Sequence, residues 1–173
     1  WKNDPNSLDT PNRVAKAYVN DLWAGRYDDM SPITSFPSDG YDGMIIERNI
    51  PLTSICSHHH QTISGVTHIG YIAGDSGKVV GLSKLNRIVE LFSRRGSIQE
   101  QLTSAIHNAV NAITKGNKGI IVTIIASFFV FNQIESCANF FCCNYKGLVG
   151  MEMTVFTILH MINHALGRMR YAL

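Results

Sequence analysis

Residues 47–72, ERNIPLTSICSHHHQTISGVTHIGYI, decide the fold, because two strand-like segments lie on either side of one loop. The first segment, Met44–Ile50, is rich in β-branched residues, and we expect Pro51 to end it. The second, Gly65–Ala73, alternates in a way that predicts a strand with both faces partly covered. The loop between them carries Cys-Ser-His-His-His at residues 56–60.

This loop has the donor atoms of a metal site. A cysteine and a histidine spaced as Cys56 and His59 can bind one zinc ion, because both lie on one tight turn. His58 then lies beside the metal, where a proton carrier is needed. The alternative interpretation is a polar surface loop without a metal.

Composition excludes several classes of protein. The 173 residues fit one domain, with 45% hydrophobic and 16% charged residues, as in a globular protein. A net charge of +2 is too small to indicate nucleic-acid binding. The longest apolar run, Gly119–Phe131, is too short to span a membrane and predicts a buried strand. Four cysteines without the spacing of a secreted scaffold, and no leader, favour reduced thiols in the cytoplasm.

Three helices are expected from local signals. The first begins at Thr10-Pro11, a hydroxyl N-cap followed by proline, and ends near Gly25. Ser83 is expected to cap a second helix with an apolar inner face. The pattern Ser97-x-x-Glu100 is a capping box that predicts a third helix, ending near Gly116. The apolar face of the second helix is made by Leu85, Ile88, Val89 and Phe92.

The order of elements predicts an α+β fold. Further strands are expected at 119–131 and 139–149, and a last helix at 156–173. After the leading helix the order is therefore β-β-α-α-β-β, which indicates an antiparallel sheet with two helices on one face. We divide the chain into an N-terminal helix and linker, 1–42, and a main domain, 43–173. Open sheet edges and a sheet face without helices favour a ring-forming homo-oligomer.

Several motifs together resemble one family. They are DTPNRVAKAYVNDLWAG at 9–25, the stretch at 47–72, GKVVGLSKLNRIVELFSRR at 77–95 and IQEQLT at 98–103. In this order they resemble GTP cyclohydrolase I, a zinc enzyme that opens the guanine ring of GTP at the start of pterin synthesis. The resemblance covers residues 9–126. It implies the tunnelling fold, in which adjacent subunits build a barrel, and a homodecamer with active sites between subunits.

The resemblance also implies residue roles around the metal. Cys56 and His59 match the first two Zn²⁺ ligands, and His58 matches the catalytic histidine, with a structural role in orienting the loop as the alternative. Ser83, at the start of the second helix, is assigned with His58 to the catalytic residues. His60 stands where the family usually has an apolar residue, and we interpret it as incidental.

Other positions match the nucleotide-binding residues of the family. Lys84 and Arg87, near a helix N-terminus, are expected to bind the triphosphate, and Arg13 is a further phosphate candidate that reaches a neighbouring subunit. Glu100, with Gln99, is expected to recognise the Watson–Crick edge of guanine. The structural alternative for Lys84 and Arg87 is a helix cap followed by solvated charges. The alternative for Arg13 is a plain surface arginine, and the alternative for Glu100 is the capping box.

The match ends after Ala126. The family continues with a second catalytic histidine, a third zinc ligand and an arginine, whereas the corresponding positions here are Phe128, Val130 and Ile134. None of these side chains carries the proton, lone pair or charge required. Two hypotheses follow: the chain is a non-catalytic relative, or the residues after Ala126 are not those of the functional protein.

The leading hypothesis is GTP cyclohydrolase I, which converts GTP and water to formate and 7,8-dihydroneopterin triphosphate. The first alternative is a degenerate subunit that binds GTP or a pterin without catalysis. Another tunnelling-fold enzyme, such as a deazapurine reductase or a pterin synthase, and a plain scaffold module are also considered.

Overall fold

The computed structural model describes residues 3–30, 32–41, 43–74, 78–128 and 139–146. Its helices are α1 (Thr10–Ala17), the π-helix η1 (Tyr18–Leu22), the 3₁₀-helix η2 (Ala24–Arg26), α2 (Leu82–Ser93) and α3 (Gln99–Ile113). Its strands are β1 (Ser35–Pro37), β2 (Met44–Ile55), β3 (Thr62–Ile72), β4 (Lys78–Val80), β5 (Gly119–Phe128) and β6 (Asn139–Lys146). The expected helix at 156–173 lies outside the described residues.

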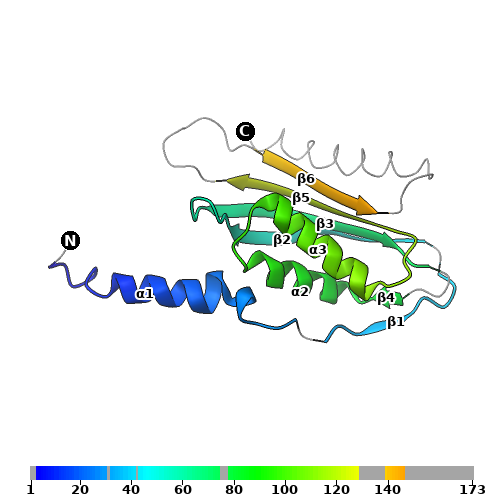
Figure 1. The fold of residues 1–173 in the computed structure, drawn as a ribbon, viewed down its shortest axis with the longest axis horizontal. Helices are drawn as coiled ribbons and strands as arrows, with labels where there is room; N and C mark the ends of the chain where they lie inside the picture. Colours follow the sequence, from blue (N-terminus) through cyan, green and yellow to red (C-terminus); the bar gives the residue numbers. More distant parts are fainter. Residues whose placement is uncertain (1–2, 31, 42, 75–77, 129–138, 147–173) are drawn as a thin grey trace.

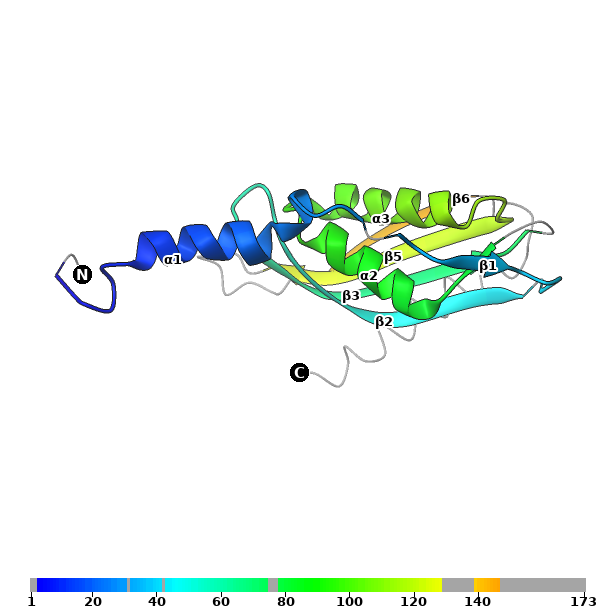
Figure 2. The same cartoon turned by 90° about the horizontal axis from the view of Figure 1, so that it is seen from below.

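The main body is a four-stranded antiparallel sheet in the order β2-β3-β5-β6. Helices α2 and α3 lie together on one face of this sheet (Figures 1 and 2). The α+β fold with the order β-β-α-α-β-β is therefore confirmed. A second pairing, between β1 and β4, was not predicted from sequence and joins residues 35–37 to residues 78–80.

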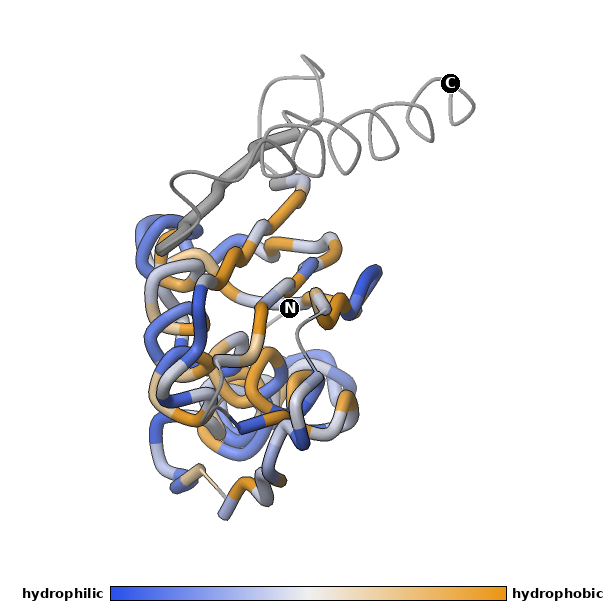
Figure 3. The backbone as a smooth tube through the Cα atoms, turned by 90° about the vertical axis from the view of Figure 1, so that its right-hand side faces the viewer, coloured by the Kyte–Doolittle hydropathy of each residue, from blue (hydrophilic) through white to orange (hydrophobic). Residues whose placement is uncertain are grey.

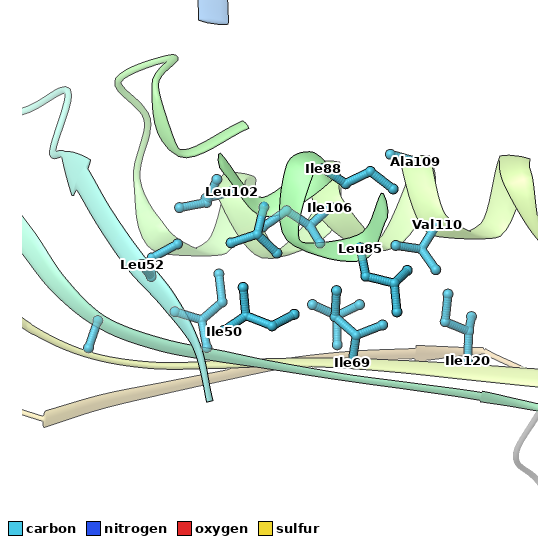
Figure 4. Close-up of a cluster of buried hydrophobic side chains, with 14 of the residues drawn as sticks. Ile50, Leu52, Ile69, Leu85, Ile88, Leu102, Ile106, Ala109, Val110 and Ile120 are labelled. Carbon is cyan, nitrogen blue, oxygen red and sulfur yellow. The ribbon is translucent and has the colours of Figure 1, made fainter. Parts of the chain in front are cut away.

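The core fills the space between the two helices and the sheet (Figure 4). Apolar side chains recur at three- and four-residue spacing on the helices and at every second residue on β5, so each element presents one apolar side to the other layer. Hydrophilic positions lie on the outer side of the helices (Figure 3). The fully buried side chains include Leu52, Ile63, Ile69, Tyr71, Leu85, Ile88, Val89, Leu102, Ile106, Val110, Ile120 and Ile124. None of the helices in the described residues has the length and apolarity needed to cross a membrane.

Strand β2 does not end at Pro51, so this expectation was wrong. The strand continues to Ile55, and Pro51 lies opposite Val66 in the register with β3. Among the described residues β2 pairs on one side only, and an edge strand tolerates a residue that lacks an N–H donor. A register shift between Glu47 and Ile50 comes before the proline.

The leading helix is less regular than expected. It begins at Thr10, but its N-cap is Asp9 and no side chain makes a capping hydrogen bond. The α-helical part ends at Ala17, and the chain continues through η1 and η2 to Arg26. Gly25 lies against α2: a Cβ atom at this position would be 2.1 Å from the Leu91 carbonyl oxygen. Glycine is therefore required here for close packing and not as a helix end.

Candidate functional site

The loop between β2 and β3 presents one thiol and three imidazoles at the end of the sheet. Its backbone closes on itself, because the Cys56 N–H donates to the Gln61 carbonyl at 2.8 Å and the His60 N–H donates to the Cys56 carbonyl at 3.0 Å. Cys56 is buried and forms no disulfide within the described residues, whereas His58 and His59 are exposed. The rings of His58 and His59 lie 6.1 Å apart, so a ligand outside the loop can reach both.

The loop residues supply the kinds of donor that zinc prefers, a thiolate and an imidazole. They do not complete a site, because the described part of the chain holds no group of three His, Cys, Asp or Glu side chains that could bind a metal ion. Catalytic zinc sites normally use three protein ligands. Val130, at the position matched to the third ligand, has no donor atom and lies outside the described residues. Within the described residues, Cys56 and His59 therefore supply two of the three protein ligands that a catalytic zinc site normally has.

The start of α2 places two cations beside a cavity. The N-cap is Gly81 and no side-chain cap forms, so the expected capping role of Ser83 was wrong. Lys84 and Arg87 line a cavity of about 360 Å³ between α2 and the segment that follows η2. In the described residues neither cation forms an ion pair, although Asp28, Asp29 and Glu90 line the same cavity.

Two neighbouring residues at the start of α3, Gln99 and Glu100, have different surroundings. Gln99 is buried, and its side-chain amide donates to the Ile124 carbonyl on β5 at 3.1 Å. Glu100 is exposed in the first turn. The N-cap is Ile98 without a side-chain cap, so the predicted capping box from Ser97 to Glu100 was wrong. The Glu100 carboxylate is therefore not used to begin the helix.

Arg13 lies far from these groups along the fold. Helix α1 contains no buried residue and projects beyond the end of the sheet (Figures 1 and 2). The Arg13 guanidinium is exposed and donates to the Asn6 carbonyl and to the Thr10 hydroxyl within its own segment. Its side chain therefore faces solvent in the isolated chain.

The candidate residues form separate groups. Ser93, the last residue of α2, accepts a hydrogen bond at 2.6 Å from the Ser54 hydroxyl next to the loop. Lys84 lies nine residues earlier, about 14 Å along the helix axis at 1.5 Å per residue. The cations near the start of α2 and the thiol–histidine loop thus lie toward opposite ends of this helix.

His60, interpreted as incidental from the sequence, has defined neighbours. Its ring lies 5.3 Å from the Trp23 ring and 5.7 Å from the Tyr18 ring. Tyr18 and Trp23, ahead of Gly25, are the sequence signal that could have revealed this contact. Polar residues surround them in the sequence, so they could not be assigned to the core.

A model of the GTP cyclohydrolase I family matches residues 2–158. Relatives named GTP cyclohydrolase 1 include that of Aeromonas salmonicida, 42% identical over 128 residues, or 73% of this chain and 57% of the relative. The Mycobacterium marinum relative is 43% identical over 120 residues, or 68% and 58%, and that of Corynebacterium glutamicum is 45% identical over 104 residues, or 60% and 53%.

The chain thus spans between half and three fifths of the length of these curated relatives. Among solved structures, an apo archaeosine synthase QueF-Like aligns with a TM-score of 0.48 and 18% identity over 61% of this chain and 95% of that one.

Proposed function

Because the chain belongs to the GTP cyclohydrolase I family, we propose that it binds GTP and opens its guanine ring by hydrolysis. The products would be formate and 7,8-dihydroneopterin triphosphate. The observation that carries this proposal is the β2–β3 loop, which holds the buried thiol of Cys56 beside the exposed imidazoles of His58 and His59. The curated relatives, at 42–45% identity, support the same reaction.

Nucleotide binding is assigned to the starts of the two helices. Lys84 and Arg87 would bind the triphosphate, because both border a cavity and form no ion pair in the described residues. Asp28, Asp29 and Glu90 border the same cavity and would have to turn away from the phosphates. Glu100 would accept hydrogen bonds from the N1–H and 2-amino groups of guanine, which adenine does not offer in this arrangement. Gln99 would support this contact by holding the start of α3 to β5.

Proton transfer is assigned to the exposed side of the loop. His58 is exposed next to His59, where an imidazole can carry a proton between solvent and substrate. Ser83, exposed in the first turn of α2, is kept with His58 as a catalytic candidate. Cys56 and His59 would contribute two ligands to Zn²⁺, and a third ligand has to come from elsewhere. Bound zinc would make water nucleophilic near neutral pH.

A complete site is proposed to form between subunits. About 14 Å of α2 separates Lys84 from the end of the helix near the loop, and α1 carries Arg13 away from the body. A neighbouring copy can bring Arg13 to the cations of α2. A homo-oligomer, with the decamer as the expected form, and a cytoplasmic location belong to this proposal.

The second candidate is a non-catalytic subunit that binds GTP or a pterin. Phe128, Val130 and Ile134 favour it, because none of them can transfer a proton, bind zinc or hold a phosphate. The competing hypothesis is that the functional protein carries other residues after Ala126. Peptide sequencing of residues 119–150 in purified protein distinguishes the two.

The test of the proposed function is conversion of GTP to a fluorescent neopterin product, measured with and without a chelator. Product that disappears on chelation supports the zinc-dependent hydrolase. GTP binding without product supports the non-catalytic subunit. Absence of binding of both GTP and a pterin in equilibrium titrations would refute both.

A further inference from the structure

Trp23 lies between two segments to which the proposed function assigns chemistry. On one side its ring is 5.3 Å from that of His60, at an interplanar angle of 64°. Tyr18 completes the cluster, with its ring 5.0 Å from Trp23 at 81° and 5.7 Å from His60. These distances lie within the range of attractive ring contacts. The segment at the end of α1 is thereby attached to the β2–β3 loop.

His60 is the point through which this attachment acts on the loop. Its φ of 54° is in the left-handed region, and its N–H donates to the Cys56 carbonyl. The backbone bonds of the loop fix its internal shape, and the pairing of Ile55 with Thr62 joins its base to the sheet. Because the His60 ring contacts Tyr18 and Trp23, this contact restricts how His58 and His59 are presented.

On its other side Trp23 lies against the turn that leads into α3. Gly96 has a φ of +61°, and a Cβ atom at this position would lie 2.4 Å from the Trp23 Nε1 atom. The Arg26 guanidinium lies 4.6 Å from the centre of the indole ring and donates to the carbonyls of Arg95 and Gly96. Helix α3 begins at Gln99, so Trp23 contacts the turn that positions Glu100.

Trp23 and its ring partners lie outside the main core. The core between the sheet and the two helices contains neither Tyr18 nor Trp23 nor His60. His60 is exposed, and Trp23 is only partly buried. Removing the Trp23 ring therefore leaves the packing of α2 and α3 on the sheet in place, and its effect is local.

We propose that Trp23 is a positioning residue that holds the β2–β3 loop, with His58 and His59, in a fixed relation to the start of α3, with Glu100. The catalytic importance of this relation rests on the proposed function. The mechanical link between the two segments does not, and it can be tested without GTP.

The test is hydrogen–deuterium exchange of the full chain, read at residues 56–61, at residues 97–102 and in the centre of α2. Trp23→Leu should raise exchange about tenfold at both of the first two segments, because the ring contacts on both sides of Trp23 are lost, and leave α2 unchanged. Trp23→Phe keeps a ring and should stay near wild type. The matched control is Tyr27→Leu, since Tyr27 is an exposed aromatic residue of the same segment.

Variants at His60 test whether the ring contact on the loop side of Trp23 acts on the loop alone. His60→Ala should raise exchange at residues 56–61 only, and His60→Phe should restore it by supplying a ring. Equal increases in every segment, α2 included, would mean general destabilisation and overturn the proposal. An increase at one of the two segments in Trp23→Leu, or at neither, would overturn it as well.

Turnover separates this proposal from the proposed function. If the wild-type chain converts GTP, Trp23→Leu should lower kcat about tenfold with a smaller change in KM, and Trp23→Phe should recover it. A wild-type chain that neither binds nor converts GTP refutes the proposed function, and the exchange pattern still decides the role of Trp23. A lowered kcat that Trp23→Phe does not recover would count against positioning by the ring.

Discussion

Glu100 and Gln99 are adjacent in sequence, yet the structure predicts opposite consequences for their replacement. Glu100 is exposed and makes no capping bond, so Glu100→Gln should change the free energy of unfolding by no more than about 0.5 kcal/mol. Gln99 is buried, and its amide donates to the Ile124 carbonyl. Gln99→Leu removes a buried hydrogen bond and should lower the free energy of unfolding by about 1–3 kcal/mol.

The effect on GTP binding should be reversed. A carboxylate can accept two N–H bonds from guanine, and an amide presents one acceptor and one donor, so Glu100→Gln loses at least one charge-assisted hydrogen bond. Such a bond contributes about 1.5–3 kcal/mol, which corresponds to a roughly 10- to 150-fold weaker Kd for GTP. Gln99→Leu should weaken binding only as far as it loosens the start of α3.

Calorimetric titration and urea unfolding measure the two quantities on the same protein samples. Inosine triphosphate, which lacks the 2-amino group, serves as the matched ligand: the preference for GTP over this analogue should shrink in Glu100→Gln. A Glu100→Gln chain that binds GTP as tightly as wild type, with an unchanged preference, would refute recognition by Glu100. It would also leave the exposed carboxylate without a role in the proposed site.

The remaining predictions concern the fold. Gly25→Ala should destabilise the chain by about 1–3 kcal/mol in urea unfolding, because a methyl group meets the backbone of α2, and unchanged stability would contradict that contact. Leu85→Ala, at a fully buried position, should cost about 2–5 kcal/mol, whereas Leu82→Ala in the same helix, 48% exposed, should cost under about 0.5 kcal/mol. Burial raises the pKa of Tyr71 above its ordinary value of 10.0, against the opposing hydrogen bond from the Val80 N–H. The stability that Tyr71 contributes is therefore present below pH 10 and is lost as the pH rises through the folded-state pKa, so Tyr71→Phe should show a shallower alkaline decline than wild type in pH-dependent unfolding.

The layered core could be predicted from sequence because its signal is local. Leu85, Ile88 and Val89 recur at helical spacing, and all three are buried against the sheet as expected. The apolar run that begins at Gly119 could likewise be assigned to a strand covered on both faces. Ile120 packs toward the helices, and Ile121 packs with Ile72 and Met44 on the other face.

The details that failed depend on partners distant in sequence. Pro51 was expected to end a strand, but it is tolerated because β2 has a neighbour on one side only among the described residues. Ser83 and Ser97 have the composition of helix caps, yet Gly81 and Ile98 occupy the N-cap positions. Capping preferences amount to about 1 kcal/mol, which the packing of two amphipathic helices on a sheet readily exceeds.

The candidate site shows the same division between local chemistry and distant arrangement. The donor groups of the loop at 56–61 could be identified from sequence, because a thiol and three imidazoles lie within one turn. The relation of that loop to Lys84 could not, since it depends on the direction in which α2 crosses the sheet. With Ser93 bonded to Ser54, the helix begins at the far end from the loop and ends beside it.

The direction of α2 affects any GTP site built from Lys84 and the residues of the loop at 56–61. Along α2, about 14 Å separates Lys84 from the end nearest the loop. Arg13 lies on a projecting helix without buried residues, and among the described residues its side chain hydrogen-bonds to its own segment. In the proposed homo-oligomer, α1 of one subunit would extend over the neighbouring body and bring Arg13 to the cations of α2 in a second copy. The phosphate-binding arrangement proposed for Arg13, Lys84 and Arg87 thus requires assembly, and a variant that dissolves the oligomer should lose GTP binding while keeping its fold.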